Sequence, residues 1–140
     1  MVRTTRETLA AMNPVLDPED FVFCSATDPA IIDRARPEAL CLFREPEGTS
    51  LVLPRAVAEK IGFDISRPMR RITLMASSEL DGVGLTAAVS VALAEEKIPC
   101  NVVAAYRHDH LFVPADMAER ALAILMQVQS EAADSRPEPE

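Results

Sequence analysis

The segment from Arg70 to Val113 switches between two hydrophobic patterns, and this switch restricts the folds open to the chain. Arg71 to Ala76 has β-branched and apolar residues at alternate positions, which predicts a strand with a buried face. From Leu85 to Glu96 apolar residues recur every three to four positions, which predicts a helix. Ile98 to Tyr106 and Leu111 to Val113 predict two further strands joined by a turn. This order indicates an α+β domain, with helices over an antiparallel sheet.

Two glycines, Gly82 and Gly84, connect the first of these strands to the helix. A strand that leads into a helix through glycines presents unpaired backbone N–H groups and the positive end of the helix dipole. This geometry suits a carboxylate or another small anion. Glycines also serve connections that bind nothing, so the spacing alone leaves a ligand site and a plain turn both open.

Charge and composition restrict the class of partner. The chain of 140 residues has a net charge of −8 and no basic patch in its sequence, which argues against a nucleic-acid-binding surface. Its 49% of hydrophobic residues predicts a folded core, yet no apolar run is long enough to cross a bilayer. Met1 to Glu7 lacks the apolar core of a signal peptide. We therefore expect a cytoplasmic protein that binds neither nucleic acid nor membrane.

The sequence gives little support for a metal site or a catalytic site. Cys24, Cys41 and Cys100 are unclustered and lie in apolar runs, which predicts reduced core residues. His108 and His110 have a metal-ligand spacing, but Asp109 between them would face the other way in a regular strand, so a polar turn is favoured.

A hydrolase would need a nucleophile with a base and an orienting group. Ser77 or Ser78 with His108 and Asp109 would make such a set, but the sequence has no nucleophile elbow. We therefore expect no catalytic residues, no metal and no other cofactor, and a protein that is not an enzyme.

The first half of the chain predicts a second set of elements. In chain order these are a helix over Thr5–Met12, a strand over Asp20–Ala26, a hairpin of Leu40–Phe43 with Ser50–Leu53, and a helix over Pro54–Ile61 ended by Gly62. Ala30 to Pro37 is left open between a helical turn and a loop.

The end of the chain predicts a helix and a tail. Asp116 is predicted to cap a helix that ends near Gln129 or Ser130, and Glu131 to Glu140 is predicted to be a disordered acidic tail. Both halves then contain a hairpin followed by a helix. We therefore predict an N-terminal module over residues 1–66, a C-terminal module over 67–130 and a tail over 131–140.

The stretch Asp81-Gly82-Val83-Gly84-Leu85 resembles the Asp-x-Pro-Gly-x-type loop of ACT domains, with Val83 where Pro is common. Asn101 to Val113 and the following helix resemble the later part of the same domain. Phe43 to Leu53 ahead of Pro54 resembles the hairpin of a second, degenerate copy. More narrowly, Arg44 to Leu51 and His108 to Val113 resemble a small bacterial family of stand-alone tandem ACT-like proteins, related to the ACT repeats of aspartate kinases and CASTOR-type arginine sensors.

The resemblance implies a ferredoxin-like (βαββαβ) ACT-like sandwich of two tandem modules, with antiparallel sheets and helices on one face. An ACT module ends with a fourth strand, for which the chain after Val128 is unsuited. We therefore infer that Phe21 to Cys24 completes the second module's sheet, as strands are lent between repeats of the aspartate-kinase type.

The resemblance also implies a function. ACT modules that bind amino acids hold the ligand's carboxylate and amine at the first strand–helix loop, and the carboxylate of Asp109 matches the ligand-holding position of CASTOR-type repeats. The candidate ligand-binding residues are Ser77, Ser78, Asp81, Val83, Gly84, Leu85, Asn101 and Asp109. We expect a regulatory sensor of a small molecule, most plausibly an amino acid, that forms a homodimer. The alternative is a protein-interaction or assembly module with a vestigial ligand site.

Overall fold

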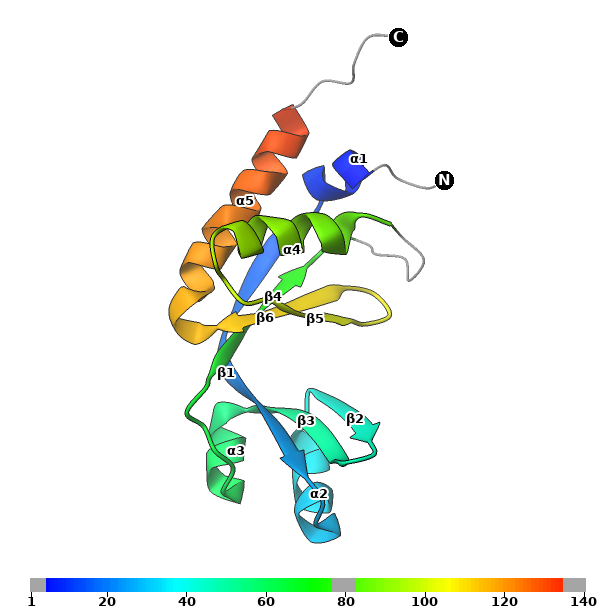
Figure 1. The fold of residues 1–140 in the computed structure, drawn as a ribbon, viewed down its shortest axis with the longest axis vertical. Coiled ribbons are helices and arrows are strands. Elements are labelled where there is room, and N and C mark those ends of the chain that lie inside the picture. The colour runs from blue at the N-terminus through cyan, green and yellow to red at the C-terminus, as the bar shows by residue number, and fades with distance from the viewer. Residues whose placement is uncertain (1–4, 77–82, 135–140) are drawn as a thin grey trace. The chain divides into compact units, whose positions relative to one another are not determined.

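A computed structural model describes residues 5–76 and 83–134 of the chain (Figure 1). Its elements are, in order, α1 (Thr5–Ala10), β1 (Pro14–Ala26), α2 (Pro29–Ala35), η1 (Arg36–Glu38), β2 (Cys41–Glu45), β3 (Gly48–Pro54), α3 (Arg55–Ile61), β4 (Met69–Leu74), α4 (Leu85–Glu95), β5 (Asn101–Ala104), β6 (Asp109–Pro114), η2 (Ala115–Met117) and α5 (Ala118–Asp134). The strands are hydrogen-bonded in the order β2-β3-β1-β4-β6-β5.

The chain divides into two compact units. The larger unit consists of Met1–Asp17 with Arg71–Glu140, and the smaller unit is Pro18–Arg70. Strands β1 and β4 are each divided between the units, so each unit holds the strands and helices of one βαββαβ set. The predicted fold class, α+β with two ferredoxin-like modules and antiparallel strand pairs, is confirmed.

The core of the larger unit lies between its sheet and the helices α4 and α5. Ile72 and Leu74 of β4 point to this core, where they meet side chains of β6, α4 and α5. The predicted apolar face of α4 is buried through Leu85, Val89 and Leu93. The N-terminal segment contributes as well, because Met12 is fully buried in the same cluster.

The smaller unit has its own core on one face of the hairpin β2–β3 and strand β1. Leu51 and Leu53 of β3 pack there with Val22 of β1. The predicted hairpin is confirmed, with a shorter turn than expected. Gly62 ends α3 in the left-handed conformation, at φ 107°, as the sequence predicted. The segment left open is helical, and Asp28 Oδ1 caps it by accepting a hydrogen bond from Ala30 N at 2.9 Å.

Strand β1 differs from its prediction. It begins at Pro14 rather than near Asp20. Pro14 and Pro18, which have no N–H to donate, lie outside the stretch Phe21–Ala26 that pairs with β3. The residues predicted to be lent to the second module, Phe21–Cys24, pair with β3 in the smaller unit. The residues of β1 that belong to the larger unit are instead Pro14–Asp17.

The last helix and one cysteine also need correction. The predicted cap Asp116 lies inside η2, whose N-cap is Pro114, and α5 continues to Asp134 rather than ending near Ser130. Residues 131–134, predicted as part of the tail, are therefore helical. Cys24 and Cys100 pack against the two cores as predicted, but Cys41 alternates with the inward-facing Leu42 and lies on the other face of β2.

Candidate functional site

The connection between β4 and α4 ends in a glycine that the backbone requires. Gly84 is the N-cap of α4 and has φ 104° and ψ −27°. Residues that have a Cβ adopt this left-handed backbone conformation only at a cost in free energy. As a glycine, this N-cap makes no side-chain hydrogen bond to the first turn of α4. Val83 is 89% exposed, whereas Leu85 is buried in the core. Ser77, Ser78 and Asp81 lie outside the described residues.

Asp109 is the first residue of β6 and its carboxyl-bearing side chain is buried, with 5% of the residue exposed. Strands β4 and β6 are neighbours, and the side chains of Thr73 and His110 meet across them. Asp109 therefore lies beside the end of β4 from which the chain leads to α4. Because it alternates with His110, its side chain points to the side of the sheet that the helices cover.

Asn101 lies apart from Asp109 along the hairpin of β5 and β6. It pairs with Phe112 and donates a hydrogen bond from Nδ2 to the Phe112 carbonyl at 3.4 Å. Asp109 pairs with Ala104, three residues along β5, which corresponds to about 10 Å. A contact of Asn101 with a ligand at Asp109 stays a prediction.

The N-terminal segment contacts both ends of the β4–α4 connection, a feature that the sequence did not indicate. The Thr5 hydroxyl donates a hydrogen bond to the Val83 carbonyl at 3.3 Å. At the other end, the Met12 carbonyl accepts hydrogen bonds from the backbone N–H groups of Met75, at 2.9 Å, and Ala76, at 3.2 Å. No local motif could have revealed these contacts, because the partners are more than 60 residues apart.

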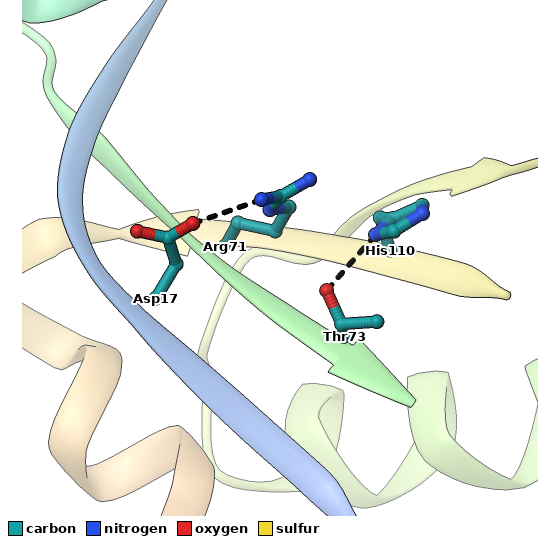
Figure 2. Close-up of polar contacts among 4 residues, drawn as sticks. All are labelled: Asp17, Arg71, Thr73 and His110. Atoms are coloured by element: carbon teal, nitrogen blue, oxygen red, sulfur yellow. Dashed lines mark hydrogen bonds and ion pairs between the residues drawn. The ribbon is translucent and has the colours of Figure 1, made fainter. Parts of the chain in front are cut away.

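A second polar cluster lies on the face of the sheet opposite to the buried Ile72 and Leu74 (Figure 2). Arg71 Nη2 is 2.8 Å from Asp17 Oδ2, and the two side chains are largely buried. Thr73 Oγ1 is 3.0 Å from His110 Nδ1. The alternation of polar and apolar residues in Arg71-Ile72-Thr73-Leu74 is the signal that could have predicted a polar face here.

The surroundings of His110 favour its neutral form. Burial lowers the pKa of His110 below its usual value, and the charges of Arg71 and His108 lower it further against the opposing effect of Asp109. His108 Nδ1 is buried and has no hydrogen-bond partner among the described residues.

Among residues 5–76 and 83–134, no group of three or more His, Cys, Asp and Glu side chains is arranged to hold a metal ion. No helix in these ranges is both long and apolar enough to span a bilayer.

Two family profiles, both described as ACT domain, match residues 3–70 and 66–127. No curated protein matches the sequence.

Solved structures with the same fold cover most of the chain. A Vibrio cholerae protein of unknown function, described as a possible transport protein, is 42% identical over 86% of this chain and 93% of its own, with a TM-score of 0.75. The regulatory subunit of aspartate kinase from Thermus thermophilus is 12% identical over 84% of this chain and 97% of its own, with a TM-score of 0.61. A structure of aspartokinase alpha and beta subunits is 13% identical over 84% and 97%, with a TM-score of 0.60. The chain belongs to the ACT-domain family and contains two ACT domains in tandem.

Proposed function

We propose that this chain is a non-catalytic regulatory protein whose larger unit binds a free amino acid beside the β4–α4 connection. The ligand's ammonium group pairs with the carboxylate of Asp109. Its carboxylate group lies at the N-terminus of α4, where backbone N–H groups and the positive end of the helix dipole suit an anion.

The observation that carries this proposal is the position of Asp109. The Asp109 carboxylate is buried, and a ligand ammonium group can approach it as a charged hydrogen-bond donor. Asp109 lies at the end of the sheet from which the chain leads to α4, whose N-cap residue, Gly84, makes no side-chain hydrogen bond. The two charges of an amino acid thus have complementary groups at one end of the larger unit.

The expected affinity is that of a metabolite sensor. A carboxylate at a helix N-terminus gains about 0.3–2 kcal/mol from the dipole. Each hydrogen bond to a charged group adds about 1.5–3 kcal/mol before ordering costs are subtracted. Two or three such bonds give dissociation constants from micromolar to millimolar.

The fold of the relatives supports a regulatory role. The Thermus thermophilus chain with this fold is itself the regulatory subunit of an aspartate kinase. The present chain matches 97% of that subunit's length, so the similarity in fold extends over nearly the whole subunit.

Calorimetry with each of the twenty amino acids and a few nucleotides tests the proposal. We expect heat with at least one amino acid, and Asp109→Asn should weaken that binding about ten- to hundredfold, the worth of one charge-assisted bond. Asp17→Asn is the matched control, because Asp17 pairs with Arg71 on the polar face that Asp109 does not share. Equal weakening by both substitutions, or no heat with folded parent protein, would contradict the proposal.

Exposed apolar side chains of the smaller unit favour the alternative, a protein-interaction module. Phe43 of β2 is 69% exposed and Phe23 of β1 is 48% exposed, and both alternate with residues of the core face. A second copy of this chain is the simplest partner for such a surface, and the two would form a homodimer. Light scattering at tens of micromolar should return the mass of a dimer, and Phe43→Ser should shift it toward the monomer. A parent protein that is already monomeric would count against self-association.

A further inference from the structure

The N-terminal segment Thr5–Asn13 forms hydrogen bonds with the rest of the larger unit at four places. Two of them, Thr5 on Val83 and Met12 on Met75 and Ala76, adjoin the β4–α4 connection. The other two are on α5. Arg6 Nη1 donates a hydrogen bond to the Ala132 carbonyl at 2.9 Å, and Asn13 and Gln129 exchange two hydrogen bonds of 2.8 Å. Figure 1 shows α1 beside α4 and the end of α5.

The absence of a side chain at Gly84 allows the Thr5 side chain to lie beside it. A Cβ built on Gly84 would lie 2.5 Å from Thr5 Oγ1 and 3.1 Å from Thr5 Cγ2, so the threonine side chain fills the space that another residue would need. The lack of a side chain at position 84 therefore serves two purposes. It permits the left-handed backbone, and it lets α1 come close to the first turn of α4.

Helix α1 has little stability of its own. It has six residues, none of which is buried, and short isolated helices are marginal in water. Its attachment depends on the contacts above and on the packing of Leu9 and Met12 against the core. An element held in this way opens more readily than the sheet beneath it.

We infer that α1 is a latch and that Thr5 and Met12 are positioning residues, which hold the two ends of the β4–α4 connection in the arrangement that binds ligand. With the latch closed, Val83 and the pair Met75 and Ala76 are fixed by hydrogen bonds from one short segment. With the latch open, Met75, Ala76 and Val83 lose these hydrogen bonds, and a ligand that needs them in place has to restore their positions at the expense of affinity. The effect on affinity rests on the proposed function, whereas the restraint on the connection does not.

Hydrogen exchange of the ligand-free protein tests the restraint. Thr5→Val removes the hydroxyl at nearly constant shape, and exchange of the backbone N–H groups of Ala88 and Val89, the first that are hydrogen-bonded within α4, should accelerate about two- to tenfold, the worth of one hydrogen bond. Thr5→Ser keeps the hydroxyl and should restore parent rates. Thr49→Val in the smaller unit is the matched control and should change none of these rates. Parent rates in Thr5→Val would overturn the inference.

Binding of the twenty amino acids, each at about 1 mM, tests the coupling. An amino acid that binds the parent protein should bind Thr5→Val about two- to tenfold more weakly, and Thr5→Ser as tightly as the parent. By reciprocity, that amino acid should slow exchange of the N–H groups of Ala11 and Met12. Equal affinity of parent and Thr5→Val would overturn the positioning role. If no amino acid binds the parent, the proposed function fails, and the exchange rates alone decide whether α1 restrains the connection.

Discussion

Truncation of Met12 measures how strongly the N-terminal segment is bound to the larger unit. The Met12 side chain is 0% exposed and packs in one cluster with Ile72 and Leu74 of β4. Met12→Ala removes three heavy atoms, which at about 0.8 kcal/mol for each buried methylene-sized group amounts to about 2.4 kcal/mol. The cavity that remains raises the expected loss of unfolding free energy to about 3–4 kcal/mol.

Urea unfolding followed by circular dichroism measures this loss, and hydrogen exchange of β6 assigns it to the larger unit if the two units unfold separately. Met126→Ala is the matched control, because Met126 is 57% exposed and its truncation should cost less than about 0.5 kcal/mol. A loss below about 1 kcal/mol for Met12→Ala would refute the assignment of the N-terminal segment to this core.

Three further predictions concern single side chains. Gly84→Val should give a folded protein that is less stable by at least about 1–2 kcal/mol in urea, because valine disfavours φ 104° and displaces Thr5; unchanged stability would argue against both causes. His110 has a folded-state pKa below its unfolded value, so its contribution is present above about pH 6.5 and is lost as pH falls through the folded pKa. Unfolding free energies from pH 8 to pH 5 should therefore decline less in His110→Gln, and parallel profiles would contradict this. Burial raises the pKa of the Cys100 thiol to about 11; at pH 8 it should alkylate at least about a hundredfold more slowly than in the unfolded chain, and similar labelling by mass spectrometry would exclude the raised pKa.

Most of the fold was predictable because local patterns and tertiary packing agree. The alternation in Arg71 to Leu74 and the helical spacing of Leu85, Val89 and Leu93 match the sides that face the core. The beginning of β1 was missed because Pro14 and Pro18, judged from the local sequence alone, predict an interruption of the strand. Both prolines precede Phe21–Ala26, the residues of β1 that pair with β3, and only the three-dimensional arrangement shows where this pairing begins.

The candidate site was predictable only in part. Gly84 and Asp109 follow from the loop pattern and the family resemblance, and the structure places them at the same end of the larger unit. Thr5 and Met12 could not be predicted, since their partners lie far along the chain and are backbone groups, which carry no sequence signal. The polar face with Arg71 and His110 was overlooked, although strand alternation contains the signal.

The division of β1 between the two units has a consequence for the order in which the chain can fold during synthesis. The smaller unit is continuous from Pro18 to Arg70, so the ribosome delivers all of it before the rest of the larger unit appears. Met12 and Leu16, in contrast, belong to a core whose other members are translated up to Val128. These two side chains must remain without their final partners until α5 has emerged, so a segment translated before the smaller unit reaches its native place after it.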